Sequence, residues 1–93
     1  MTAYVITELT VRDAEALDRY RKEVGPVLKQ FGGELLAVSP WHVFHGEPAY
    51  DFGTIIAFPD KEAALAWYSS PAYQALNPVR EKAFDSRFRL IGE

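Results

Sequence analysis

The pattern of apolar and polar positions divides the first third of the chain into a strand and a helix. Residues 3–11 (AYVITELTV) are rich in β-branched and aromatic side chains, which predicts a strand. Asp13 follows in the position of a helix N-cap, and apolar residues then recur at spacings of three and four as far as Phe31. The glycine pair 32–33 predicts the end of this amphipathic helix. Pro26 falls inside the helix and is expected to kink or divide it.

The rest of the chain alternates between strand-like and helix-like segments. In chain order, we expect a long or bent strand over residues 33–46, a turn over 46–51, a strand over 52–58, a helix over 60–68, a helical segment over 72–84 and a last strand over 88–92. Proline cannot donate to a ladder, so the long strand should be interrupted at Ser39-Pro40. Ser70 followed by Pro71 is typical of a helix start, and Pro78 should bend the segment that follows.

The predicted order is strand, helix, strand, strand, helix, strand, which is typical of a ferredoxin-like α+β fold with both helices on one face of an antiparallel sheet. A chain of 93 residues fits one domain over residues 1–93. LLAV and TIIAF are continuous apolar runs, whereas a sheet with one wet face should alternate. The second face should therefore be apolar too, which predicts a homodimer through this open sheet face.

Composition excludes several classes of protein. The absence of cysteine excludes a disulfide scaffold and a cysteine–zinc site, and a net charge of −3 argues against nucleic-acid binding. No apolar run approaches the ~18 residues that span a membrane, and the N-terminus lacks the basic region of a signal peptide. We therefore expect a cytoplasmic protein without a membrane partner. There is no nucleophile elbow and no phosphate-binding glycine loop, so no cofactor is expected.

Aromatic residues on the predicted helix faces are the main candidates for a small-molecule site. Tyr20, Trp67, Tyr68 and Tyr73 are typical of a pocket with an aromatic lining and a few polar groups. The alternative is that they are core residues whose polar atoms bond to the backbone. This alternative is the stronger one for Tyr73.

Charged residues offer a second set of candidates. An inward Arg80 could hold an anionic or carbonyl ligand, or it could pair with Glu81, Asp85 or an acid of a partner chain. Arg87 and Arg89 share one face of the last strand, which favours a solvated or dimer-rim position.

Glu8 and the two histidines allow weaker hypotheses. Glu8 shares a strand face with Tyr4 and Ile6, so a buried carboxylate there could be a general base, although a position near the strand end favours contact with water. His42 and His45, with the acids Glu47 and Asp51 nearby, could form a metal cluster. Residues three apart on a strand point to opposite faces, which favours the absence of a metal site.

The sequence resembles the domain-of-unknown-function family thirteen-thirty, within the dimeric α+β barrel superfamily. The resemblance rests on AYVITELTV, Tyr20, FGGELLAV and above all AFPDKEAALAWYSSPAYQALNPVREKA. It covers essentially the whole chain and implies a dimer whose sheets face one another. The superfamily includes cofactor-free monooxygenases, cyclases, haem-degrading enzymes and small-molecule binders, and its cavity lies between the helices and the sheet.

The family pattern implies the residues that line such a cavity. They are Tyr20, Phe58, Trp67, Tyr68, Ser70, Tyr73 and Arg80. Family members often carry an arginine just before the third strand, where this chain has Asp51-Phe52-Gly53. The resemblance therefore does not imply an anion-binding role at this position of the chain.

Two hypotheses for function remain at this stage. In the first, the protein is a cofactor-free enzyme acting on an aromatic or carbonyl metabolite, with Trp67 and Tyr68 orienting the substrate and Tyr20 and Arg80 donating hydrogen bonds to its oxygen. In the second, the same cavity holds a ligand without reaction, as in a regulatory module. A cavity that lacks a group with a strongly shifted pKa favours binding. A dimer with no pocket at all is a third possibility.

Overall fold

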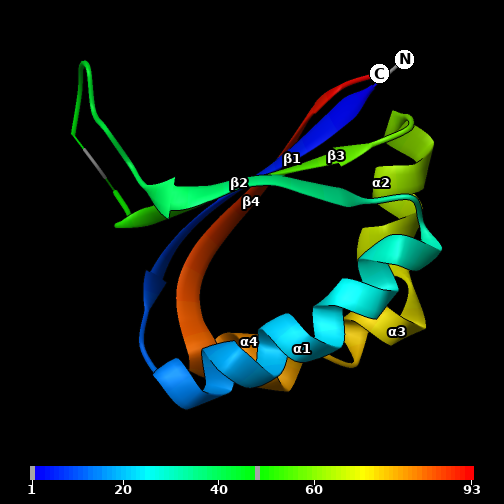
Figure 1. The fold of residues 1–93 in the computed structure, drawn as a ribbon, viewed down its shortest axis with the longest axis horizontal. Helices are drawn as coiled ribbons and strands as arrows, with labels where there is room; N and C mark the ends of the chain where they lie inside the picture. The colour runs from blue at the N-terminus through cyan, green and yellow to red at the C-terminus, as the bar shows by residue number, and fades with distance from the viewer. Residues whose placement is uncertain (1, 48) are drawn as a thin grey trace.

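The computed structural model describes residues 2–47 and 49–93 (Figure 1). Its elements are β1 (Ala3–Val11), α1 (Ala14–Gln30), β2 (Glu34–Pro40), β3 (Phe52–Phe58), α2 (Lys61–Ser69), α3 (Pro71–Gln74), α4 (Asn77–Ala83) and β4 (Phe84–Gly92). The predicted order of strands and helices is confirmed.

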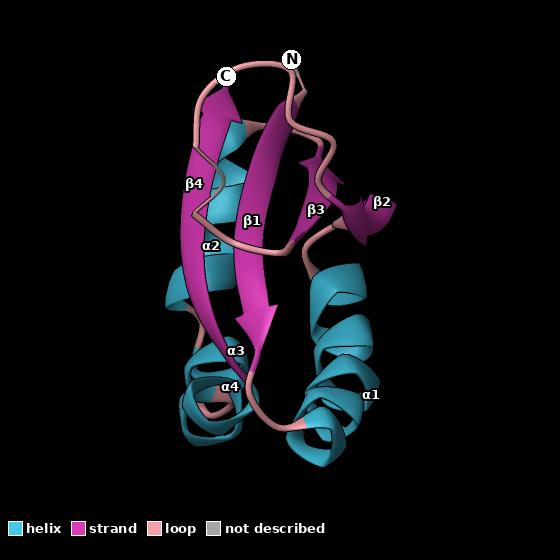
Figure 2. Ribbon diagram, turned by 90° about the vertical axis from the view of Figure 1, so that its left-hand side faces the viewer, coloured by secondary structure: helices cyan, strands magenta, loops and turns pink. Residues whose placement is uncertain are grey.

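The strands form one four-stranded antiparallel sheet in the order β2-β3-β1-β4. All the helices lie on one side of it, and the opposite side is open (Figure 2). The sheet curves, and its concave face is turned toward the helices (Figure 1). This is the predicted α+β architecture.

The alternation of side chains along β1 assigns the two faces of the sheet. Val5, Thr7 and Leu9 are buried beneath the helices, whereas Tyr4 and Glu8 point to the open face. The register places Tyr4, Ile6 and Glu8 each between a β3 and a β4 residue on that same open face. A one-residue slip would exchange the two faces, so the buried set fixes the register.

The helix starts follow the predicted capping residues. The Asp13 carboxylate accepts a hydrogen bond from Ala16 N at 3.1 Å, and the Asp60 carboxylate accepts one from Ala63 N at 2.8 Å. At the end of α1, Gly32 has a φ of 76°, a left-handed conformation that glycine adopts without strain. Pro26 lies within α1 and does not divide it.

Three predicted boundaries are wrong. β2 ends at Pro40 instead of continuing to residue 46, because proline has no N–H for the ladder. The segment 72–84 is not one bent helix: α3 and α4 are separate, since Pro78 has no N–H to continue the helix and instead occupies the first turn of α4. β4 begins at Phe84 instead of residue 88, because the full length of β1 pairs with it.

The core lies between the helices and the concave face of the sheet. Its largest fully buried side chains are Trp67, Tyr73 and Phe58. No helix in the two described ranges is long and apolar enough to cross a membrane.

The open face of the sheet is less apolar than predicted. Tyr4, Ile6 and Ile91 are apolar members of it, but Glu8 also lies there and pairs with Arg87 and Arg89 of β4. The arginines have half-exposed side chains, whereas only 14% of the Glu8 side chain is exposed. The face therefore combines an apolar half with a charged cluster.

Candidate functional site

A chain of hydrogen bonds joins α1 to the three later helices. The hydroxyls of Tyr20 in α1 and Tyr73 in α3 lie 2.7 Å apart, and either can donate. Arg80 in α4 donates through Nη1 to the Tyr73 oxygen at 3.2 Å and to the Tyr68 oxygen, from α2, at 3.3 Å. Four side chains far apart in sequence thus share one polar network inside the fold.

Aromatic packing holds this network in place. The Trp67 ring centre lies 4.4 Å from that of Tyr73 and 5.9 Å from that of Tyr68. The Arg80 guanidinium carbon lies 5.2–5.7 Å from the ring centres of Tyr68, Tyr73 and Phe88. We call Tyr20, Trp67, Tyr68, Tyr73 and Arg80 the aromatic–arginine cluster. The structure thus brings together all four candidate ligand residues, with Tyr73 at the centre.

A cavity of about 710 Å³ lies between α1 and the concave face of the sheet. Its lining is mostly apolar and comes from α1 and all four strands, with Leu17, Val24, Leu28, Leu35, Val38 and Ile56 among its members. Thr7, Tyr20 and Trp67, whose side chains each carry one polar group, also line it. We call this space the large cavity, and its volume is within the range of small-molecule sites, roughly 300–1,000 Å³.

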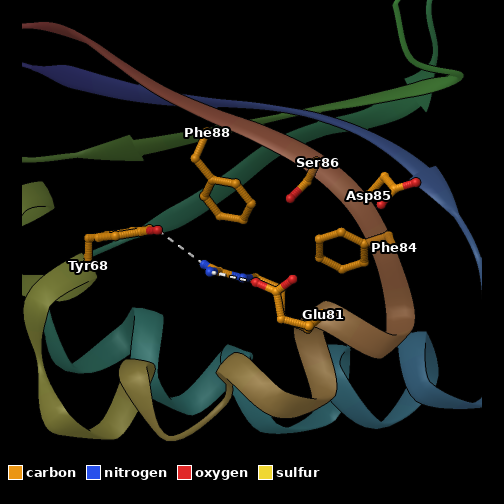
Figure 3. A pocket seen from close by; sticks show the side chains of 7 residues that line it. Tyr68, Glu81, Phe84, Asp85, Ser86 and Phe88 are labelled. Atoms are coloured by element: carbon orange, nitrogen blue, oxygen red, sulfur yellow. Dashed lines mark hydrogen bonds and ion pairs between the residues drawn. The ribbon is translucent and has the colours of Figure 1, made fainter.

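A second, smaller space of about 260 Å³ contains Arg80 (Figure 3). It is lined by Tyr68, Arg80, Glu81, Phe84, Asp85, Ser86 and Phe88, and we call it the arginine pocket. Phe84 and Phe88 line both spaces. The expectation of a single cavity for all four candidates is therefore not met: Tyr20 and Trp67 line the large cavity, whereas Tyr68 and Arg80 line the arginine pocket. The reason is that these two phenylalanines lie between them.

Tyr20 and Tyr73 hold their protons. Burial, together with the neighbouring Tyr73, raises the pKa of Tyr20 far above its ordinary value. Burial also raises the pKa of Tyr73, although the hydrogen bonds from Tyr20 and Arg80 oppose this rise. Neither hydroxyl can act as a general base near neutral pH, and both remain hydrogen-bond donors.

Arg80 remains charged in spite of its burial. Burial lowers its pKa, but the hydrogen bonds to Tyr73 and Tyr68 outweigh this effect, so that the pKa of Arg80 lies above its usual value. The only carboxylate in ion-pair distance is that of Glu81, 3.7 Å from Nη2, within the part of the chain that the structure describes. Glu81 is 74% exposed, so this pair is weak.

Two buried polar atoms have no hydrogen-bond partner among the described residues: Nε1 of Trp67 and Oδ1 of Asn77. Trp67 is 1% exposed and lines the large cavity. Leaving a buried donor unpaired costs free energy, on the order of 1–3 kcal/mol. A ligand oxygen in the cavity is one way to satisfy the indole N–H.

Glu8 is not arranged as a general base. Its partial burial alone would raise the pKa, but hydrogen bonds and charge from Arg87 and Arg89 outweigh burial and lower the pKa below its ordinary value. The sequence favoured contact of Glu8 with water, whereas in the structure Glu8 is ion-paired with Arg87 and Arg89 on the open face.

The histidine segment does not form a metal cluster. No group of three histidines or acids converges among residues 2–47 and 49–93. His42 instead stacks edge-on against Phe44, with ring centres 4.9 Å apart.

Sequence reasoning missed Phe84 and Phe88. Phe84 was assigned to a helix and Phe88 to a strand that began too late. The alternation of Phe84, Ser86, Phe88 and Leu90 is the period-two pattern of a strand and could have identified them.

Comparison with known proteins agrees with this fold. The model of the family described as domain of unknown function (DUF1330) matches residues 2–93. The chain belongs to this family. No curated protein matches the chain.

Solved structures similar to this family member share its fold. A protein of unknown function from Rhodopseudomonas palustris has a TM-score of 0.80 at 21% identity, with 99% of this chain and 82% of that chain covered. A dimeric ferredoxin-like protein of unknown function from Jannaschia sp. CCS1 has a TM-score of 0.66 at 17% identity, with both chains fully covered. SnoaB, a cofactor-independent oxygenase from Streptomyces nogalater, has a TM-score of 0.71 at 11% identity, with 99% and 92% covered. The ferredoxin-like fold is therefore confirmed.

Proposed function

We propose that this protein binds a small, mainly apolar molecule with a hydrogen-bond-accepting oxygen in the large cavity. The observation that carries this proposal is the Tyr20 side chain, which lines the apolar cavity and joins, through its hydroxyl, a hydrogen-bond chain that ends at a cation. An apolar pocket with a few placed polar groups is the usual composition of a small-molecule site.

The direction of the hydrogen bonds supports a donor role for Tyr20. Arg80 can only donate, so the Tyr73 oxygen accepts from it. If Tyr73 then donates to Tyr20, the Tyr20 O–H remains free for an acceptor in the cavity. In the opposite direction, the Tyr73 O–H has no acceptor among the described residues. Each arrangement leaves one tyrosine O–H without a protein acceptor among the described residues, and the first leaves that of Tyr20, which lines the large cavity.

The indole of Trp67 supplies a second donor on the same lining. Its unpartnered N–H would be satisfied by the ligand, and its ring would pack against an apolar or aromatic body. In the folded protein, the lining would bury that body much as the core buries its own side chains.

Binding of a ketone and of its hydrocarbon parent tests this proposal. We expect 1-tetralone to bind more tightly than tetralin in a titration followed by calorimetry. Tyr20→Phe should weaken 1-tetralone binding by about five- to tenfold, the effect of one hydrogen bond of ~1 kcal/mol, and should leave tetralin unchanged. Tyr4→Phe, on the open face, is the matched control. Equal affinity of the wild type and Tyr20→Phe for 1-tetralone would contradict the donor role.

A cofactor-independent oxygenase is the second candidate function. It is favoured by the fold shared with SnoaB and by donors that would stabilise an oxygen anion as charge develops on it. Because Tyr20 and Tyr73 keep their protons, such a reaction would need a substrate that is acidic and electron-rich by itself. The test is oxygen consumption by the wild type and by Tyr20→Phe in the presence of 1-naphthol. Equal consumption by the two proteins would contradict the oxygenase function and leave ligand binding as the proposal.

We also propose that two copies pair through their open sheet faces. Tyr4, Ile6 and Ile91 present apolar surface there, and the similar structures from Jannaschia and from Thermobifida fusca are described as dimeric. Sedimentation at micromolar concentration should give a dimer for the wild type and a monomer for Tyr4→Glu, which places a charge in the apolar half. A monomeric wild type would contradict the pairing.

A further inference from the structure

The arginine pocket is a second site, separate from the large cavity by its lining. Only Phe84 and Phe88 belong to both linings, and neither Tyr20 nor Trp67 reaches the arginine pocket. Its position is also different: Figure 3 shows it between β4, which carries Phe84, Ser86 and Phe88, and the helices that carry Tyr68 and Glu81.

The guanidinium of Arg80 uses only one of its three nitrogens for hydrogen bonds in the part of the chain that the structure describes. Nη1 donates to both Tyr73 and Tyr68, which occupies its two hydrogens. Nη2 lies 3.7 Å from Glu81, beyond hydrogen-bond distance, and Nε has no protein acceptor there. The remaining edge of the guanidinium, Nε–H and Nη2–H, is the pair of parallel donors that matches the two oxygens of a carboxylate.

The Arg80 guanidinium is poorly accessible to water. The Arg80 side chain is only 13% exposed, and three aromatic rings pack around its guanidinium. A partly buried cation gains more from a bound anion than an exposed one, because the surrounding dielectric constant is lower. Glu81 screens it weakly, since its carboxylate is mostly in solvent.

We infer that the arginine pocket binds a small carboxylate, for which benzoate is the probe, through the Nε and Nη2 edge of Arg80. The Ser86 hydroxyl, which points from β4 into the pocket in Figure 3, provides a further donor. The volume of about 260 Å³ has room for a single ring with its carboxylate.

The charge of the pocket selects a monoanion. Glu81 and Asp85 also line it, and Asp85 is already paired with Arg12 at 3.0 Å. With Asp85 paired in this way, Arg80 and Glu81 bring one positive and one negative charge, so a bound monocarboxylate leaves one net negative charge and a phosphate leaves up to two. A carboxylate is therefore preferred over inorganic phosphate.

An NMR titration with sodium benzoate tests the inference in the full-length protein. We expect the Arg80 Nε–H signal and the Ser86 amide to shift in a saturable way, while benzamide, the neutral analogue of equal shape, and inorganic phosphate shift neither. Shifts at Val24 and Leu35 instead would place benzoate in the large cavity and overturn the inference. Absence of any saturable shift up to millimolar benzoate would overturn it as well.

Two variants distinguish paired hydrogen bonds from the Arg80 edge from simple attraction to a positive charge. Arg80→Lys keeps the positive charge without the parallel donors and should weaken benzoate binding about tenfold. Glu81→Gln removes the competing carboxylate at an exposed position, so folding should be unaffected and benzoate should bind severalfold more tightly. If Arg80→Lys fails to fold, the Glu81→Gln variant provides the test. Benzoate binding to Glu81→Gln that is no tighter than binding to the wild type would contradict the inference. The 1-tetralone experiment is independent, because it follows Tyr20 and the large cavity.

Discussion

On the helix side of the sheet, hydroxyls and aromatic rings hold the Arg80 guanidinium, whereas on the open side the Glu8 carboxylate holds Arg87 and Arg89. The open-side cluster contains its own anion, and both arginines donate to the Glu8 carboxylate. The helix-side cluster has no closely bonded carboxylate and leaves one guanidinium edge, one tyrosine hydroxyl and one indole N–H without protein acceptors among the described residues. The comparison teaches that the helix side keeps donors without protein acceptors beside its two cavities, in the part of the chain that the structure describes, whereas on the open side the arginines pair with a carboxylate of the same sheet.

The largest difference between the two sides should appear in stability. Trp67→Ala removes a buried ring that contacts Phe58 and Tyr73 and should lower the free energy of unfolding by about 3–5 kcal/mol. Tyr4→Ala on the open face, studied as a dissociated monomer, should cost less than about 1 kcal/mol. Urea unfolding of both variants measures this. Equal costs would show that the helix side is not the main core.

Tyr73→Phe should have the next largest effect, because it removes the central hydroxyl of the chain. Both Tyr20 and Arg80 lose a partner, and we expect a loss of about 1–2 kcal/mol at neutral pH. Because the folded pKa of Tyr73 is raised, wild-type stability falls as the pH rises above roughly 10, the unfolded value. Urea unfolding across the alkaline range should show a shallower fall in Tyr73→Phe. An identical slope would mean that Tyr73 ionises freely in the folded state.

Glu8→Gln tests the open side and should have the opposite pH dependence. The folded pKa of Glu8 is lowered, so its contribution is present above the unfolded value of roughly 4.3 and is lost as the pH falls through the folded value. At neutral pH the variant should be less stable by about 1 kcal/mol, and at strongly acidic pH, below the folded pKa of Glu8, the two proteins should converge. Thermal unfolding at both pH values gives the comparison, with Glu47→Gln in the loop as control. A constant difference at all pH values would contradict the ion-pair assignment.

Gly53→Ala should have the smallest effect on stability. A Cβ at this position would collide with the Trp41 ring, which lies over the open face and is partly exposed. The ring can move away, so we expect a cost below about 1 kcal/mol but a changed environment for Trp41. Tryptophan fluorescence with Trp67 as the buried reference measures this. An unchanged spectrum would mean that Trp41 does not rest on Gly53.

Local chemistry made the fold predictable. Capping aspartates, the glycine after α1 and the β-branched strands each act within a few residues, so β1, α1, β3 and α2 were recognised with nearly correct bounds. Two of the boundaries that failed lie at prolines, and the third depends on a partner distant in sequence. The full length of β4 from Phe84 is fixed by its pairing with β1 as far as Val11.

For the candidate site, the sequence named the residues but not their arrangement. Tyr20, Trp67, Tyr68 and Arg80 were selected by residue type and family pattern, and they do share one cluster with Tyr73. Their roles as ligand residues stay predictions.

The sequence by itself determined the α+β class, the family and the chemical groups available. Only the tertiary structure decided which of these groups face each space, because that depends on how α1, α4 and β4 pack. Packing placed Phe84 and Phe88 between Tyr20 and the free edge of Arg80, and it paired Glu8 with arginines some 80 positions away. Burial and partner distance set pKa and donor availability, and both are properties of packed side chains rather than of neighbouring residues in the chain.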